Sequence, residues 1–357
     1  MTDYKQKLSD LLLTTAKQQA SDLHLSVGRR PTIRLDSVLI PLTKESILTN
    51  EDTVGLVSVL LSSEQLANLA LKKQIDLSYN FEDKARFRVN VYYQRNFMTA
   101  ALRLIPAKIK TIEELSLPPI LHDFTKLNQG FILIVGPAGH GKSTTLAAVL
   151  DEINHQRTEH IITIEDPIEY LFSQDRCIIS QREVGQDTLS FYDGLRSVLR
   201  QDPDVIMVGE IRDPETMATA MTAAETGHLV FSTLHTNSAA QTIDRMIDSF
   251  PPVQQGQIVS QLASTLVAII SERLVPRVGG GRVPATEIML ANAAVRNLIR
   301  ERKIYQIDLV IETSIQEGMI SLNRSLVNLV KRNEISLEQA ESYSLNPAEL
   351  RILLERT

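Results

Sequence analysis

A glycine-rich loop with one lysine and two hydroxyl residues is the part of this chain best suited to chemistry. It follows the apolar run 131–135 and consists of Gly136, Pro137, Ala138, Gly139, His140, Gly141, Lys142, Ser143 and Thr144. Small residues let the backbone curl so that its N–H groups surround phosphates, and the helix expected next adds its positive N-terminus. Lys142 would reach the terminal phosphates of ATP, and the Ser143 hydroxyl would bind Mg²⁺. The pattern therefore predicts a P-loop.

Two acidic clusters after apolar runs could complete a hydrolytic site, because a P-loop enzyme needs carboxylates for Mg²⁺ and for the attacking water. The first, residues 163–169, contains Glu165, which we expect to act in catalysis and to hold Mg²⁺ directly or through water. The second, residues 204–213, places Glu210 after a strand, at the sheet edge where ligands of α/β folds bind. Glu210 is the predicted general base or water-orienting group.

Two histidines, His228 and His235, flank the apolar run 229–234. As neutral hydrogen-bonding groups they could sense a γ-phosphate, although residues that flank a core strand are more often structural. Their spacing along a strand, with no cysteine nearby, makes them a poor metal pair.

A mostly parallel sheet is needed to position these residues. Apolar runs at 131–135, 161–164, 205–208 and 229–234 alternate with helical segments, which is typical of a sheet covered by helices. Three glycines at 279–281 join residues 273–278 to 282–290 as a hairpin, and the chain after Ser321 is expected to be helical.

The first part of the chain has a different pattern, which predicts a small α+β domain. Helical spacing in residues 5–20, 51–61 and 63–71 is combined with strand alternation in 22–27, 85–95 and 98–105. We expect an N-terminal domain at 1–105, a linker at 106–117 and an ATPase domain with C-terminal helices at 118–357.

Composition narrows the class of protein. The chain has 357 residues and a net charge of −6 without a lysine or arginine block, so nucleic acid is not an expected partner. Cys177 is the one cysteine, which excludes an internal disulfide or tetracysteine zinc site, and we expect it to be a half-buried apolar residue. No apolar run approaches the length of a signal peptide or membrane span, and we expect a cytoplasmic protein.

The set of motifs resembles the secretion-superfamily hexameric ATPases and, within them, the PilT-like type IV pilus retraction motors. The resemblance covers essentially the whole chain, including Ala-Ser-Asp-Leu-His-Leu at 20–25, the P-loop, an Asp box at 163–170, an atypical Walker B around Glu210 and a His box at 227–236. Its most specific part is the octapeptide Ala-Val-Arg-Asn-Leu-Ile-Arg-Glu at 294–301, which departs from the retraction-motor signature only by Val295 for isoleucine. By itself this segment predicts an amphipathic helix with Val295, Leu298 and Ile299 inward and its two arginines outward.

The resemblance implies an α/β protein with a PAS-like α+β domain followed by a RecA-like P-loop ATPase domain, assembled as a ring hexamer. It implies that ATP lies between subunits, that Arg88 and Arg103 reach a neighbour's nucleotide, and that His228 and His235 act in catalysis. The function it implies is a Mg²⁺-dependent ATPase motor for pilus retraction and twitching motility. Such a motor acts on an inner-membrane pilus platform protein at the cytoplasmic face of the inner membrane, with a paralogous retraction ATPase as a further partner. His140 stands where the family commonly has serine, which could alter nucleotide affinity.

Several alternatives stay open. The chain could be the accessory retraction paralogue, whose motifs overlap with those of the main motor. Pilus-assembly and type II secretion ATPases typically carry an extra N-terminal domain and a four-cysteine zinc motif. We expect neither in this protein, which favours retraction over extension. A DNA-translocating RecA-like enzyme is disfavoured by the acidic balance. Glu210 argues against a nucleotide-binding scaffold without turnover.

Overall fold

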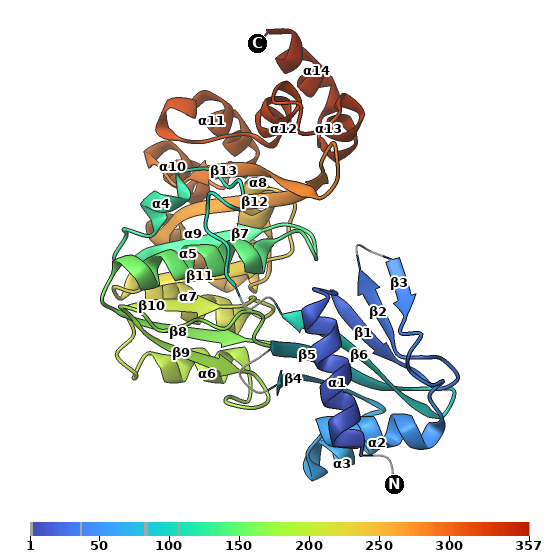
Figure 1. The fold of residues 1–357 in the computed structure, drawn as a ribbon. Helices are drawn as coiled ribbons and strands as arrows, with labels where there is room; N and C mark the ends of the chain where they lie inside the picture. The colour runs from blue at the N-terminus through green and yellow to red at the C-terminus, as the bar shows by residue number, and fades with distance from the viewer. Residues whose placement is uncertain (1–2, 36–37, 82–84, 106–107, 357) are drawn as a thin grey trace. The chain divides into compact units, whose positions relative to one another are not determined.

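The computed structural model describes residues 3–35, 38–81, 85–105 and 108–356 (Figure 1). The chain divides into two compact units. One comprises Met1–Lys108 with Pro167–Leu171, and the other comprises Ile109–Asp166 with Phe172–Thr357. Most of the expected linker 106–117 therefore belongs to the second unit, because Ile112 and Leu117 are buried in its core. The first two residues of that linker lie outside the described residues.

The first unit is built on an antiparallel six-stranded sheet in the order β3-β2-β1-β6-β5-β4. Its elements are α1 (Tyr4–Lys17), β1 (Asp22–Leu25), β2 (Thr32–Leu35), β3 (Val38–Pro41), α2 (Asn50–Leu60), α3 (Ser63–Lys72), β4 (Gln74–Phe81), β5 (Ala85–Gln94) and β6 (Phe97–Ile105). Capping boxes start α2 and α3, at Thr49 with Asp52 and at Ser62 with Gln65. The expected α+β pattern is confirmed.

Successive side chains of β5 point to opposite faces of this sheet, so one face is apolar and the other carries charges. Phe87, Val89 and Val91 are completely buried against the helices, in the same core as residues of α1, α2 and α3. Arg88 points to the opposite face and pairs directly with Arg103 of β6. The two arginines singled out in the sequence are therefore neighbours on one face of the first unit.

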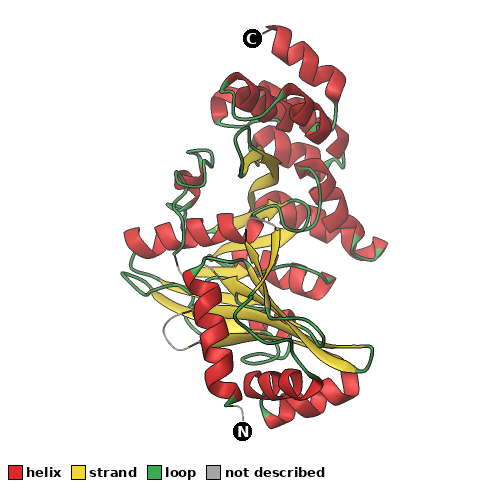
Figure 2. Ribbon diagram, turned by 45° about the vertical axis from the view of Figure 1, so that its right-hand side comes forward, coloured by secondary structure: helices red, strands yellow, loops and turns green. Residues whose placement is uncertain are grey.

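The second unit is built on a seven-stranded sheet in the order β13-β12-β7-β11-β10-β8-β9 (Figure 1). Figure 2 shows the strands in yellow and the helices in red. Its strands are β7 (Gly130–Val135), β8 (His160–Glu165), β9 (Ile178–Glu183), β10 (Val205–Val208), β11 (Leu229–Leu234), β12 (Leu266–Pro276) and β13 (Arg282–Leu290). All neighbouring strands are parallel except β13, which forms the expected hairpin with β12. The sequence predicted this sheet but not β9, which forms its far edge.

Helices cover both faces of the parallel sheet, and residues on the two sides of β7 are therefore equally buried. Ile132 and Ile134 pack toward α5, whereas Phe131, Leu133 and Val135 pack toward the core that contains α7 and α9. The helices are α4 (Leu121–Phe124), α5 (Lys142–Gln156), α6 (Phe191–Val198), α7 (Pro214–Glu225), α8 (Ala239–Asp248), α9 (Pro252–Thr265), α10 (Ala293–Arg300), α11 (Ile307–Thr313), α12 (Leu322–Lys331), α13 (Leu337–Tyr343) and α14 (Pro347–Arg356), with short 3₁₀ turns η1 (Ile304–Gln306) and η2 (Ile315–Glu317). None of the helices in the described part of the chain has the length and apolar character that crossing a bilayer requires.

Candidate active site

The predicted P-loop connects β7 to α5. Gly136, Gly139 and Gly141 have φ values of 147°, 76° and 98°, a backbone region that strongly favours glycine. Two of these glycines are also required by space, because a Cβ would lie 2.3 Å from the Glu272 carbonyl oxygen at Gly136 and 2.5 Å from its carboxylate at Gly141. The loop is thus shaped by its own glycines and by the neighbouring strand β12.

Lys142, the first residue of α5, is buried and directs its ammonium into the loop. Its Nζ donates hydrogen bonds to the carbonyl oxygens of Gly136 at 2.8 Å and Pro137 at 2.9 Å. The third neighbour is Nδ1 of His235, 3.4 Å away. Ser143 and Thr144 follow in the first turn of the 15-residue helix, where the helix dipole favours an anion. The arrangement places a positive charge, hydroxyl groups and a helix N-terminus together.

Glu210 follows β10 and is held there by hydrogen bonds on both sides of it in the chain. The amide of Gly209 donates to the Ile164 carbonyl at 2.8 Å, and the amide of Ile211 donates to the Thr233 carbonyl at 3.1 Å. The Thr233 hydroxyl donates to the Gly209 carbonyl at 2.6 Å. These bonds fix the turn between β8 and β11, so that the carboxylate projects at the carboxyl edge of the sheet.

Two side chains hold the Glu210 carboxylate. Its Oε2 lies 3.3 Å from Nε2 of His235, and its Oε1 accepts a hydrogen bond from the Arg212 guanidinium. That hydrogen bond raises the pKa of Arg212, and the charge of Asp166, 3.7 Å from the guanidinium, acts in the same direction. Because the Lys142 ammonium can only donate, the His235 Nδ1 accepts and its Nε2–H donates to Glu210. The structure thus links Lys142, His235 and Glu210.

Glu165 ends β8, the strand next to β10, and is also brought to this edge. Its carboxylate is buried and accepts hydrogen bonds from the Thr163 hydroxyl at 2.7 Å and from the Gln181 amide at 3.1 Å. Gln181 lies on β9, the strand that the sequence did not predict. The carboxylate therefore has a fixed orientation at the sheet edge that also holds Glu210.

His228 is not brought to this edge, whereas the catalytic role that the resemblance implies for both histidines would place it there. It precedes β11 whereas His235 follows it, and seven residues of extended chain span about 20 Å. Its Nδ1 donates to the carbonyl oxygen of Ala223 in the last turn of α7, at 2.8 Å. In the second unit His228 therefore stabilises the C-terminal end of α7.

Arg88 and Arg103 lie in the first unit and belong to a row of charges across its sheet. The register places Arg34, Asp22, Arg103 and Arg88 side by side on four strands. Nε of Arg103 donates to Asp22 at 3.0 Å, and Nε of Arg34 lies 3.7 Å from the same carboxylate. Nη1 of Arg88 lies 3.8 Å from Glu169, in the segment grouped with this unit. The row carries more arginines than the carboxylate among them can neutralise.

His140, the residue that departs from the usual serine, anchors the P-loop to β12. Its Nδ1 accepts a hydrogen bond from the Leu274 amide at 3.0 Å, which requires that this nitrogen carry no proton. Burial lowers the pKa of His140, and the nearby Arg282, Arg273 and Lys142 lower it further, so the ring stays neutral. Arg282 adds a second anchor by donating to the Gly139 carbonyl at 3.2 Å.

The octapeptide 294–301 forms α10 almost as predicted. Val295 and Ile299 are completely buried and Leu298 is partly buried. Arg296 corrects the expectation that both arginines point outward. Its Nη1 donates to the Ala263 and Ser264 carbonyls, each at 2.8 Å, and so satisfies the end of α9.

Cys177 is a second correction. It is fully buried rather than half-buried, and burial raises the pKa of its thiol. The thiol therefore has little nucleophilic thiolate at neutral pH.

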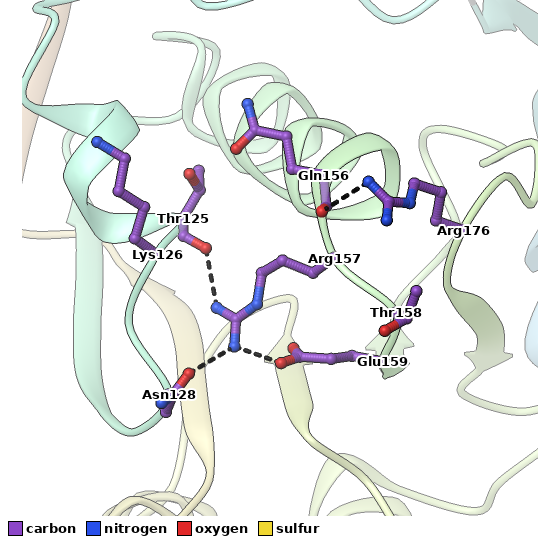
Figure 3. Close-up of a pocket in the computed structure, with 8 residues that line it drawn as sticks. All are labelled: Thr125, Lys126, Asn128, Gln156, Arg157, Thr158, Glu159 and Arg176. Carbon is purple, nitrogen blue, oxygen red and sulfur yellow. Dashed lines mark hydrogen bonds and ion pairs between the residues drawn. The ribbon is translucent and has the colours of Figure 1, made fainter.

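A polar pocket at the far end of α5 is separate from this site (Figure 3). The residues that line it are Thr125, Lys126, Asn128, Gln156, Arg157, Thr158, Glu159 and Arg176. Arg157 donates to the Thr125 carbonyl at 2.8 Å and to the Asn128 side chain at 3.0 Å, and it forms an ion pair with Glu159. Its guanidinium is thus used to join chain segments, which makes this pocket structural.

Reasoning from the sequence missed Arg212, Gln181 and Glu272. Arg212 follows Glu210 by two residues, and an arginine so close to a strand-end acid indicates an ion pair at the site. The signal for Glu272 was a carboxylate inside β12, whose other residues are apolar except Ser271 and Arg273. Gln181 had no comparable signal, because its role depends on a strand pairing that alternation did not reveal.

Comparison with known proteins finds relatives of one family, and their similarity extends over nearly the whole chain. The model of the Type II/IV secretion system protein family matches residues 3–282. The type IV pilus retraction ATPase PilT of Pseudomonas aeruginosa is 44% identical over 340 residues, which are 95% of this chain and 98% of that protein. The type IV pilus ATPase PilU of the same organism is 38% identical over 346 residues, 97% of this chain and 90% of that one. A crystal structure of the pilus retraction motor PilT with bound ADP is 44% identical, with a TM-score of 0.90 and coverage of 98% of this chain and 99% of that one. The likeness confirms the expected α/β fold.

Proposed function

The chain belongs to the Type II/IV secretion system protein family, and from that premise we propose that it is a Mg²⁺-dependent ATPase motor of type IV pilus retraction. The observation that carries the enzymatic part is the link from Lys142 through His235 to Glu210, since it joins a phosphate-binding lysine to a strand-end carboxylate. The retraction part is supported by the 44% identity with the retraction ATPase PilT.

The P-loop fits the phosphates of a nucleotide. Its positive-φ glycines permit a tightly curled backbone, and the start of α5 supplies amides and a favourable dipole. Lys142 would exchange the carbonyl oxygens of Gly136 and Pro137 for phosphate oxygens, which are stronger acceptors because they are charged. ATP is thus the proposed substrate, bound by residues 136–144.

Oxygen donors for a hard cation lie in the P-loop helix and at the carboxyl edge of the same sheet, where Glu165 ends β8, three strands from β7. Ser143 stands in the first turn of α5, and Glu165 would hold the ion directly or through water; one or two protein oxygens are the usual share for Mg²⁺. When bound, Mg²⁺ would neutralise part of the phosphate charge. These assignments agree with the fixed orientation of the Glu165 carboxylate.

Glu210 is the proposed general base or water-orienting residue. Its carboxylate is only 18% exposed and is held by Arg212 and His235, so that its orientation is set before substrate arrives. His235 directs Nε2 toward this carboxylate. A nucleotide that draws Lys142 toward its phosphates would also free the acceptor side of this ring.

Arg88 and Arg103 are proposed to act on the nucleotide of a neighbouring subunit in a homo-hexamer. An arginine that reaches developing phosphate charge is worth about 10³ to 10⁵ in rate. Their strands place them side by side, and their partners Asp22 and Glu169 are single carboxylates that a more highly charged phosphate could replace. Hydrolysis would then depend on the assembled ring.

The proposed partner is a pilus platform protein of the inner membrane, which the motor would meet at the cytoplasmic face. A second candidate function is that of an accessory retraction ATPase beside a main motor, which the 38% identity with PilU keeps open. The higher identity with PilT favours the main motor.

The enzymatic proposal is tested by steady-state phosphate release from the purified protein at increasing concentration, with and without DNA. We expect Mg²⁺-dependent turnover whose specific activity rises as rings form and does not change with DNA. Stimulation by DNA would favour a translocase, and nucleotide binding without turnover would favour a scaffold.

A further inference from the structure

Glu272 supports both ends of the P-loop although it belongs to β12. Its carbonyl oxygen lies 2.3 Å from the position that a Cβ on Gly136 would take, and its carboxylate Oε1 lies 2.5 Å from the corresponding position at Gly141. The other carboxylate oxygen accepts a hydrogen bond from the Thr145 hydroxyl in the first turn of α5, at 2.7 Å. Only 2% of the residue is exposed to solvent. This carboxyl group thus packs directly beneath the loop proposed to hold the phosphates.

Few charged groups surround Glu272, and they differ in how strongly they stabilise its carboxylate. Burial raises the pKa of this carboxyl to about 7, while the Thr145 hydrogen bond and the Lys142 ammonium act in the opposite direction. Arg273, next in the strand, donates instead to the Tyr343 carbonyl, and Arg282 of β13 bonds to the Gly139 carbonyl. His140 is neutral because its Nδ1 accepts from Leu274. Lys142 is therefore the cation whose field most favours the ionised form.

We propose that Glu272 is a positioning residue of the nucleotide site, and that nucleotide binding takes up one proton from solvent onto its carboxylate. This inference rests on the proposed binding of nucleotide by the P-loop. Phosphates in the P-loop bring negative charge close to Glu272, which packs beneath that loop. They also neutralise the Lys142 charge that stabilised its ionised form. The protonated acid still accepts the Thr145 hydrogen bond and continues to support the loop.

The sign of the pH dependence follows from this linkage. Below the pKa of the nucleotide-free protein, about 7, Glu272 is already protonated and binding is tightest. As pH rises above that value, the carboxylate must gain a proton to bind nucleotide, and affinity falls until the pKa of the bound form is passed. Each unit by which nucleotide raises this pKa lowers the high-pH affinity about tenfold relative to the low-pH affinity.

The test is isothermal titration calorimetry of Mg²⁺–ADP binding between pH 6 and 9, at each pH in two buffers with different ionisation enthalpies. The variant is Glu272→Gln, which keeps the shape and an oxygen acceptor but cannot titrate. The matched control is Glu287→Gln on β13. Glu287 is also buried, with its pKa raised to about 7 by burial, but its carboxylate accepts from the Ala239 amide, at 2.7 Å, instead of contacting the loop.

We expect the wild type and Glu287→Gln to take up more protons per ADP than Glu272→Gln near pH 7.5. Between pH 6.5 and 8.5 their ADP affinity should fall by a factor about ten times larger than that of Glu272→Gln. The protons bound by the nucleotide itself cancel in this comparison. Equal proton uptake and parallel pH profiles in the wild type and Glu272→Gln would overturn the inference while leaving nucleotide binding intact. If Glu272→Gln fails to fold, Thr145→Val replaces it: loss of the hydroxyl should move the fall in affinity to higher pH, and an unmoved profile would overturn the inference. Failure of the proposed function is a different outcome, namely ADP affinity that Lys142→Ala does not change.

Discussion

The imidazole of His235 lies against the carboxylate of Glu210, with Nε2 3.3 Å from Oε2. The other nitrogen of the same ring faces Nζ of Lys142 at 3.4 Å. Because an ammonium cannot accept a hydrogen bond, the ring is held as the tautomer that carries its proton on Nε2. One side chain therefore connects the lysine of the P-loop to the proposed base.

Lys142→Ala should abolish tight ATP binding, because the ammonium is the main positive charge beside the β- and γ-phosphates. The lysine is buried and satisfies the carbonyls of Gly136 and Pro137, so thermal unfolding must be recorded as well. The measurement is nucleotide affinity by calorimetry. Affinity equal to that of the wild type would contradict the P-loop assignment.

Glu210→Gln should retain ATP binding and lose turnover by about 10²-fold or more, since the amide keeps the shape but cannot accept the proton of the attacking water. Phosphate release and nucleotide affinity are measured on the same preparation. Near-normal turnover would transfer the role of base to Glu165. The matching Glu165→Gln variant distinguishes the two carboxylates by its effect on the Mg²⁺ requirement.

His235→Ala and His228→Ala should have different effects although they flank the same strand. The first removes the link between Lys142 and Glu210, so we expect reduced turnover. The second removes a hydrogen bond to the Ala223 carbonyl at the end of α7, so we expect a loss of about 1 kcal/mol in unfolding free energy with turnover per folded protein unchanged. A turnover loss for His228→Ala as large as that for His235→Ala would show that the placement of β11 does not explain their roles.

Exposed residues of α10 should matter for pilus movement rather than for nucleotide chemistry. Arg300 is exposed, whereas Arg296 holds the end of α9 and Ile299 is in the core. We expect Arg300→Ala to impair retraction without changing thermal stability or hydrolysis. The control is Arg332→Ala, at an exposed arginine after α12, which should leave retraction, thermal stability and hydrolysis unchanged. Ile299→Ala should instead cost about 2–5 kcal/mol of stability. Normal retraction by the Arg300 variant would leave the α10 surface without a role in movement.

Arg88 and Arg103 should act across subunits. An Arg88→Ala, Arg103→Ala chain should recover ATPase activity when mixed with a Glu210→Gln chain, because some mixed interfaces combine an intact P-loop and Glu210 with intact arginines. Steady-state phosphate release is measured before and after subunit exchange. No gain in rings shown to be mixed would count against this sharing of the site.

The sequence predicted the elements around the P-loop because local signals define them. A buried apolar strand, glycines and a helix follow one another within residues 130–156, and the acids Glu165 and Glu210 directly follow apolar strands. The sequence could not show that Glu272 lies under Gly136 and Gly141, because this contact joins positions more than 130 residues apart through the pairing of β12 with β7. The error on Arg296 has a similar cause: helical periodicity gives the direction of a side chain but not the unpaired carbonyls that it can reach.

The central claim, a retraction motor driven by hydrolysis at Glu210, is tested most directly by imaging labelled pili in cells from which the gene has been deleted. Cells that carry the Glu210→Gln gene instead of the wild-type gene should extend pili and fail to retract them, while restoration of the wild-type gene should restore retraction. Deletion cells that still retract pili at the wild-type rate, or that no longer extend pili at all, would contradict the account.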